Sequence, residues 1–191
     1  MNRLLPSDFH GSKYGLTYRL VNESDAAFII ELRTAPQVGQ FLHKTSSCVD
    51  DQKKWIKTYK EREENGTDYY FIFFKDGEPI GLDRIYDIDG TTFNVGSWVM
   101  KQDVPIEYVL AVPLITNEIA FELLDLELND SPDGVHENNK KVLKFNKMLG
   151  YKVTGEYLSE NGRFYSIRLI KKDFEAKKKS LIRMLNIEGY E

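Results

Sequence analysis

Residues 139–151 have the sequence NKKVLKFNKMLGY and form the most informative stretch of the chain. Asparagine is a favoured N-cap residue, because its side-chain oxygen accepts a hydrogen bond from a backbone N–H of the first helical turn. Glycine commonly follows the last residue of a helix, because it adopts the left-handed conformation without strain. The stretch therefore predicts a helix that is capped by Asn138 or Asn139, runs through Leu149 and ends at Gly150.

Strand-like segments lie on both sides of this helix. Residues 151–159 and 163–170 flank the turn sequence ENG at 160–162 and predict a closing hairpin. Residues 126–136 predict a strand that turn-forming residues break up near its end.

An antiparallel meander is predicted further upstream. Residues 68–75 have the aromatic-rich sequence DYYFIFFK, which favours a strand. Asp-Gly turns then join it to strand-like segments at 79–88 and 92–100. Three consecutive strands joined by tight turns form a meander.

The remaining segments complete the order of elements. Residues 1–13 are expected to form an irregular arm, and 17–21 alternate polar and apolar residues as a half-buried strand does. Further helices are predicted at 26–33 (capped by Ser24-Asp25), 52–64, 108–124 (interrupted by Pro113) and 173–185. The order β-α-α-β-β-β-α-β-α-β-β plus a final helix predicts a mixed α/β domain.

This order resembles the GNAT fold of N-acetyltransferases. Residues 139–151 look like the GNAT signature Asn-x-x-Ala/Ser-Ile/Leu-x-Leu/Phe-Tyr-x-Lys-x-Gly-Phe/Tyr, and 77–100 resemble two strands of the RimL-like subgroup, particularly enzymes of amino-sugar and nucleotide-sugar pathways. The resemblance implies a central, mostly antiparallel, twisted sheet of about seven strands flanked by helices. We expect a single domain over 1–191, with its core at about 16–170 and a C-terminal helical extension at 171–191.

Composition limits the class of protein. Hydrophobic residues make up 41% and charged residues 29%, the balance of a soluble globular protein. The net charge of -4 argues against nucleic acid as a partner, because phosphate contacts need a basic face. A single cysteine, Cys48, and the lack of a signal peptide or of an apolar run of roughly 20 residues predict a cytoplasmic location away from membranes.

The resemblance implies an acetyl-CoA site between strands 92–100 and 126–136. These two strands are expected to diverge near Met100 and Val135, which leaves backbone groups of Val99, Met100 and Lys101 free for the pantetheine arm. By resemblance Asn139 also reaches the pantetheine, a role compatible with its capping of the helix.

The phosphate loop departs from the family pattern Gln/Arg-x-x-Gly-x-Gly/Ala. The corresponding residues 104–109 are VPIEYV, so Val104, Glu107 and Val109 replace the three key positions. Glycines let backbone N–H groups turn toward phosphates, and Glu107 adds a negative charge. We expect Glu107, Tyr108 and Val109 to contact the pyrophosphate, with modest affinity.

The catalytic positions are also altered. Asn146 stands where most family members have a tyrosine that protonates the CoA thiolate, and an amide cannot act as that acid. A thiolate with a pKa near 8.5 leaves fairly well unaided. Candidates for the general base are His136, His43 and Asp83, with a surface position for His136 and an ion pair of Asp83 with Arg84 as alternatives.

The acceptor is expected to be a small-molecule amine. Arg33, Lys44 and Arg84 are candidates to bind an anionic acceptor such as a nucleotide-sugar phosphate, together with His43 and Asp83 at the acceptor pocket. No metal site is expected, and the basic helix 173–185 is expected to pack on the domain or on a second subunit of a homodimer.

Three functions stay open at this level. The first is acetyl transfer to an amino sugar or nucleotide sugar, and the second is protein N-terminal acetylation of the RimL type. The third is a catalytically silent GNAT module for CoA binding or interaction, which the residues at Val104, Glu107 and Asn146 favour over a generic enzyme.

Overall fold

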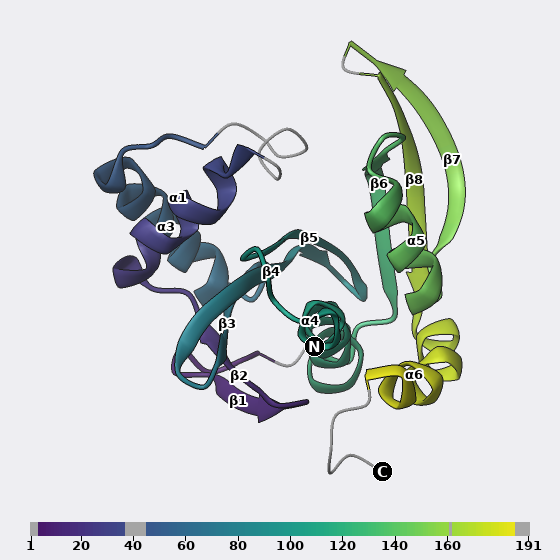
Figure 1. Cartoon of the computed structure of the whole chain (residues 1–191), viewed down its shortest axis with the longest axis horizontal. Helices are drawn as coiled ribbons and strands as arrows, with labels where there is room; N and C mark the ends of the chain where they lie inside the picture. The colour runs from purple at the N-terminus through teal and green to yellow at the C-terminus, as the bar shows by residue number, and fades with distance from the viewer. Residues whose placement is uncertain (1–3, 37–44, 161, 186–191) are drawn as a thin grey trace.

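The computed structural model describes residues 4–36, 45–160 and 162–185. A single sheet has the strand order β1-β2-β3-β4-β5-β6-β8-β7, and helices lie on both of its faces (Figure 1). Neighbouring strands are antiparallel except for β5 and β6, which are parallel. The strands are β1 His10–Lys13, β2 Leu16–Leu20, β3 Tyr69–Lys75, β4 Glu78–Asp89, β5 Thr92–Met100, β6 Leu128–His136, β7 Lys152–Ser159 and β8 Gly162–Ile170.

The helices divide between two apolar cores. They are α1 Ala26–Thr34, α3 Val49–Glu64, α4 Ile106–Glu118, α5 Lys140–Leu149 and α6 Lys171–Leu185. α1 and α3 cover one face of the central strands, where Ile29, Ile56 and Leu82 are buried together. The other helices cover the opposite face, where the larger core contains Phe71 and Phe121. None of the helices within the described ranges is long and apolar enough to cross a membrane.

The predicted mixed fold is confirmed, but the sheet has eight strands in place of about seven. The additional strand is β1, in the segment expected to be an irregular arm. Tyr14 and Gly15 both have positive φ values, 52° and 74°, and form the tight turn that pairs β1 with β2. Two residues with positive φ match the twist of a hairpin. Of the two, only glycine is a residue type that indicates a positive φ in the sequence.

One local expectation, the cap of the first helix by Ser24-Asp25, is wrong. The helix start near residue 24 is capped by Asn22, whose side chain accepts a hydrogen bond from the N–H of Ser24 at 2.9 Å. Asp25 completes a capping box by accepting from the N–H of Asn22 at 2.8 Å. The long third helix runs through Pro113 to Leu123, close to its predicted bounds, and it includes a π-helical turn at Ile119–Leu123 that was not predicted.

α6 is bound to the rest of the fold by both apolar and charged contacts. It buries Phe174, Leu181 and Leu185 in the larger core. The ammonium group of Lys178 lies 2.7 Å from the buried carboxylate of Glu118 on α4. That carboxylate also accepts from the hydroxyl of Tyr14 at 2.6 Å and pairs with Lys13 at 2.7 Å. One buried charge thus joins the β1–β2 turn, α4 and α6.

Candidate active site

β5 and β6 separate soon after they begin. Thr92 is opposite Leu128 and Phe93 is opposite Asn129, and no other pairs join the two strands in the part of the chain that the structure describes. Figure 1 shows β6 running with β8 while β5 stays with β4. The two strands diverge as predicted, but they part directly after Phe93 and Asn129 and not near Met100 and Val135, which leaves one edge of β5 open from about Asn94 to Met100.

A bulge in β5 shapes this opening. Leu82 is opposite Val99 and Arg84 is opposite Gly96, so β5 has one more residue than β4 between these pairs. Ser97 lies at this point with φ 57°, a conformation that costs energy for a residue with a Cβ atom. Bulges of this kind bend a strand and re-aim its side chains, and they are frequent beside active sites.

The backbone of β5 offers fewer free groups than the sequence suggests. The N–H of Lys101 donates to the carbonyl of Ile80 at 2.8 Å, so the expectation of a free amide at Lys101 is wrong. Successive residues of a strand direct their backbone groups to opposite edges. Val99 therefore shares the β4 edge with Lys101, and the backbone of Met100 faces the opening.

Residues 104–109 lie at the start of α4, where the phosphate loop was placed. Pro105 is the N-cap, and its carbonyl accepts from the N–H groups of Tyr108 at 3.0 Å and Val109 at 3.2 Å. These two amides are therefore already used. The first amides of a helix have no intrahelical acceptor, so Ile106 and Glu107 are the residues whose N–H groups remain for an anion.

A cation at this helix end was missed from the sequence. The ammonium group of Lys75, at the end of β3, lies 5.3 Å from the centre of the Tyr108 ring. It also donates to the carboxylate of Asp76 at 2.8 Å, which offsets its charge. In the sequence, Lys75 is recognisable only as the residue before the Asp76-Gly77 turn. That position does not indicate which helix its side chain approaches.

A buried polar cluster lies in the larger core, at the level where β5 and β6 part. Asn129 donates to the hydroxyl of Tyr151 at 2.7 Å and accepts from Ser131 at 3.1 Å. The Tyr151 hydroxyl is also 3.5 Å from the side-chain oxygen of Asn117. Burial is the main reason that the pKa of Tyr151 is raised, and the nearby carboxyl of Asp83 adds to the rise.

Asp83 is the titratable group of this cluster. It is completely buried on β4, and burial raises its pKa from 3.8 to about 8 against the opposing contacts of the Thr116 hydroxyl and the Arg84 N–H. Its Oδ1 accepts from that N–H at 3.0 Å, while Oδ2 has no hydrogen-bond partner within the described ranges. A carboxyl in this state exchanges a proton near neutral pH, which suits a general base.

The other two polar candidates on this side are His136 and Asn146. The Nδ1 atom of His136 accepts from the N–H of Asn138 at 3.1 Å, and its ring meets the Phe164 ring edge-on at 5.0 Å. The Nδ1 atom of His136 is therefore engaged by the backbone of the connection between β6 and α5. Asn146 lies on α5 next to Phe145, and its backbone carbonyl accepts from the N–H of Tyr151 at 2.9 Å.

Asn139 is the N-cap of α5, as predicted, and its side chain accepts from the N–H of Val142 at 3.4 Å. Gly150 ends the helix with φ 104°. The signature stretch therefore has its predicted local structure, and its first residue lies just after β6 at the open side of the sheet.

Two of the predicted acceptor residues, Arg33 and Arg84, lie on the opposite face of the sheet from Asp83. Arg84 donates through Nε to Asp68 at 2.7 Å and contacts its second carboxylate oxygen through Nη2. The predicted alternative of an ion pair between the Asp83 and Arg84 side chains is therefore wrong, because adjacent strand residues point to opposite faces. Arg33 donates to Thr45 at 2.8 Å and to Ser97 at 3.0 Å. His43 and Lys44 lie outside the described residues.

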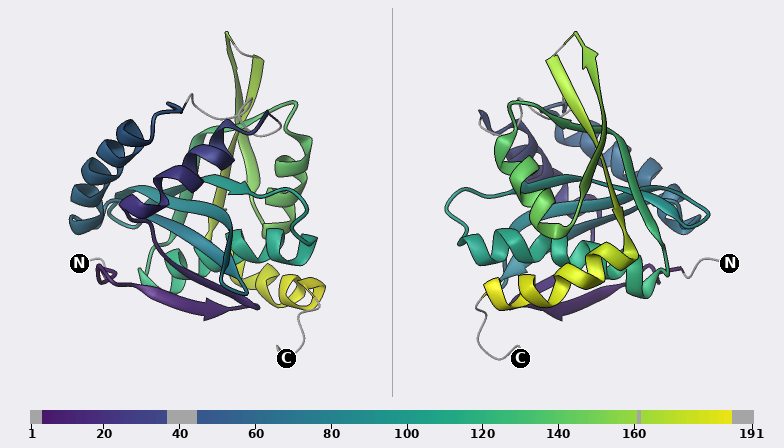
Figure 2. Two further views of the ribbon diagram at one scale, coloured as in Figure 1. Left: turned by 60° about the vertical axis from the view of Figure 1, so that its left-hand side comes forward. Right: turned by 90° about the vertical axis from the view of Figure 1, so that its right-hand side faces the viewer.

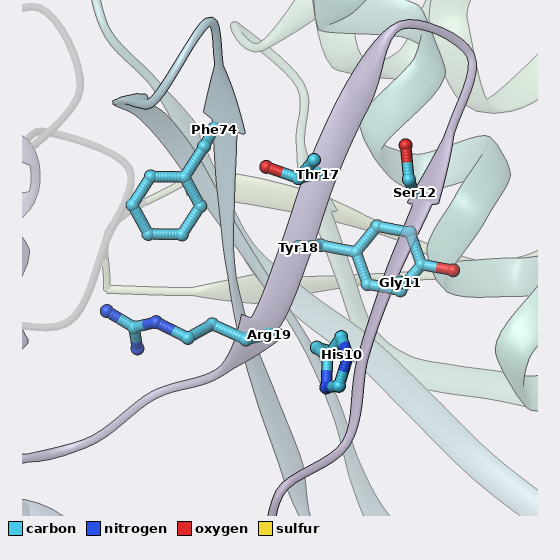
Figure 3. Close-up of a pocket in the computed structure, with 7 residues that line it drawn as sticks. All are labelled: His10, Gly11, Ser12, Thr17, Tyr18, Arg19 and Phe74. Atoms are coloured by element: carbon cyan, nitrogen blue, oxygen red, sulfur yellow. The ribbon is translucent and has the colours of Figure 1, made fainter.

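A separate hollow of about 550 Å³ lies at the other end of the sheet (Figure 3). Its lining residues are His10, Gly11, Ser12, Thr17, Tyr18, Arg19 and Phe74. They belong to β1, β2 and β3, several strands away from the opening beside β5, and the hollow is shallow and apolar. It contains none of the candidate catalytic residues, so the strand opening stays the candidate active site.

Comparison with known proteins shows the family of the chain. The family model for the acetyltransferase (GNAT) domain matches residues 16–152. Among solved structures, apo FdhC, described as a nucleotide-linked sugar GNAT, is 30% identical with a TM-score of 0.78, covering 93% of this chain and 99% of that one. No curated protein sequence gives a significant match.

More distant structures share the fold. The ribosomal-protein-S5-alanine acetyltransferase from Vibrio fischeri is 17% identical, with a TM-score of 0.75 over 87% of this chain and 99% of that one. Spermidine N-acetyltransferase from Vibrio cholerae, solved with CoA and spermine, is 15% identical, with a TM-score of 0.70 over 85% and 99%. With the family model covering most of the chain and the strand opening in place, the chain belongs to the GNAT acetyltransferase family.

Proposed function

We propose that this protein transfers an acetyl group from acetyl-CoA to the amino group of a nucleotide-linked amino sugar. The observation that carries the acceptor class is the 30% identity, over nearly all of both chains, to the nucleotide-linked sugar GNAT. The structures that act on protein N-termini or polyamines are less than 20% identical to this chain and share its fold.

The strand opening is suited to hold the acyl-CoA arm. The backbone of Met100 faces the opening and offers the pairing that β6 would supply if the strands stayed together. The free N–H groups at the start of α4, those of Ile106 and Glu107, together with the helix dipole, attract the pyrophosphate. The carboxylate of Glu107 opposes that attraction, so we expect a modest affinity.

We propose Asp83, of the three base candidates, as the group that receives the proton of the acceptor ammonium. Its carboxyl has a pKa of about 8 and an unused oxygen within the described part of the chain, whereas the Nδ1 atom of His136 already accepts a hydrogen bond. Asp83 is fully buried, so in this proposal a water molecule that enters with the substrates relays the proton to it. The thiolate of CoA leaves without an acid at Asn146.

Product analysis tests the acceptor class. The purified protein is incubated with acetyl-CoA and, separately, a nucleotide-linked amino sugar, a peptide with an N-terminal alanine, and spermidine. We expect free CoA and a mass gain of one acetyl group with the sugar. Acetylation of the peptide alone would support the N-terminal alternative, and binding of acetyl-CoA without turnover of any amine would support the silent module.

The pH dependence tests the base. The rate should rise with pH through the pKa of Asp83, about 8, because the base acts in its ionised form. Asp83→Asn keeps the shape of the side chain and should remove this rise and lower kcat about 10²-fold or more. An unchanged profile in Asp83→Asn would assign the base elsewhere, with His136→Ala as the next variant to measure.

A further inference from the structure

The indole of Trp98 has a polar atom that the free protein does not use. Trp98 follows the strained residue Ser97 in the β5 bulge, and its ring packs against Phe145 of α5 with centroids 4.7 Å apart. The nitrogen Nε1 is shielded from solvent and has no hydrogen-bond partner among the described residues. A buried N–H without an acceptor costs about 1–3 kcal/mol, so such groups are rare in folded proteins.

The Trp98 N–H lies beside the opening between β5 and β6. Trp98 lies beyond the last residue of β5 that pairs with β6, and α5 follows directly after β6. The contact between Trp98 and Phe145 therefore spans the opening between the separated strands. The bulge at Ser97 is what adds a residue to β5 here, and both the strain and the unpaired N–H occur at this one point.

The chemistry of the indole restricts its partner. Its N–H donates and cannot accept, so it cannot bind the ammonium group of an acceptor amine. A ligand entering the opening must present an oxygen with a free lone pair. The acyl-pantetheine arm has three such carbonyl groups, namely the thioester and two amides.

We propose that the Trp98 N–H donates to a carbonyl oxygen of the acyl-pantetheine arm and positions the arm in the opening. The inference rests on the proposed binding of acetyl-CoA. It adds a side-chain donor to the backbone of Met100, which faces the same opening, whereas Lys101 is bonded to Ile80 and Val99 shares that edge. Trp98 is thus a positioning residue for the acyl donor.

Trp98→Phe tests the proposal, because phenylalanine keeps an aromatic ring against Phe145 and lacks the N–H. We expect the Kd for acetyl-CoA, measured by calorimetry, to rise about threefold to tenfold, as for one lost hydrogen bond. The midpoint of thermal unfolding of the free protein should stay the same or rise, since the variant has no unpaired N–H to bury. A tryptophan with only a structural role would instead lower the unfolding midpoint and leave the Kd unchanged, which would overturn the proposal.

Two further measurements separate the possible failures. Trp55→Phe, at the only other tryptophan, is the matched control and leaves Trp98 as the single indole fluorophore. In that variant the emission of Trp98 should change when CoA is added, and no change in a protein that binds CoA by calorimetry would refute the contact. If Trp98→Phe weakens the binding of CoA and of acetyl-CoA equally, the acceptor of the Trp98 N–H is a pantetheine amide. If it weakens the binding of acetyl-CoA alone, the acceptor is the thioester carbonyl. Wild-type protein that binds neither would refute the proposed function itself.

Discussion

Asp83→Asn should make the protein more stable at neutral pH while it lowers activity. In the folded protein the pKa of Asp83 is about 8, against an ordinary value of 3.8. Because the folded state holds the proton more tightly, the stability from this group is complete below pH 3.8 and falls as the pH rises toward 8. At pH 7 this group has lowered the free energy of unfolding by roughly 4 kcal/mol relative to its value below pH 3.8. The loss is about 1.4 kcal/mol for each pH unit.

Asparagine has no proton to take up, so the variant does not lose stability in this way. The difference in unfolding free energy between variant and wild type should therefore grow in the variant's favour from pH 5 to pH 8. Replacing the carboxyl also changes its contacts with Thr116 and Arg84, by about 1–3 kcal/mol, but that part does not depend on pH. The slope of the difference against pH is accordingly the quantity to test.

Urea unfolding at pH 5, 6, 7 and 8 measures this slope for both proteins. Subtracting the two curves removes the titration of every group they share. Asp89→Asn changes an exposed carboxylate on the same strand and serves as the matched control. A difference between Asp83→Asn and wild type that stays constant over this range would refute the raised pKa and, with it, the reason for proposing Asp83 as the base.

Three further predictions follow from the site and its supports. Glu107→Gly should tighten acetyl-CoA binding by calorimetry, because it removes a like charge beside the pyrophosphate; weaker binding would mean that the phosphates lie elsewhere. Glu118→Gln should lower the free energy of unfolding by about 1–3 kcal/mol, because the ammonium groups of Lys13 and Lys178 lose their buried partner. Urea unfolding measures this change. In the control Glu122→Gln, loss of the more exposed ion pair with Lys178 should cost less than about 1 kcal/mol. Asn146→Ala should lower kcat about tenfold or less, and abolished turnover would give Asn146 a role beyond a single hydrogen bond.

Local signals predicted most of the elements, and the resemblance to the GNAT family predicted the strand opening. The Asn139 cap, the Gly150 helix end and the Asp-Gly hairpins are all defined by residues close together in sequence, which is why they could be recognised. The polar cluster could not, because Asp83, Asn117, Asn129 and Tyr151 come from separate elements that only the tertiary fold brings together. Nothing in the periodicity of their segments marks them as neighbours.

The side-chain partners and backbone conformations of single residues could also not be predicted from the sequence. The partner of Arg84 is Asp68, on the preceding segment, and the adjacent Asp83 points to the other face of the sheet. The bulge in β5 has its positive φ at Ser97 and not at the neighbouring Gly96, so the residue that most often marks such a conformation does not mark it here.

The charge cluster at Glu118 has a consequence for how the chain folds. Tyr14 and Glu118 are 104 residues apart in sequence, and Lys178 contacts the same carboxylate from α6, the last helix of the described residues. Contacts this distant in sequence slow folding, because a long loop must close before they form. Until α6 docks, the Phe121 side of the π-helical turn after α4, which Phe174 covers, stays exposed, and partly folded chains of this kind aggregate. Refolding should therefore show a late phase that Glu118→Gln alters, and a low protein concentration should raise its yield.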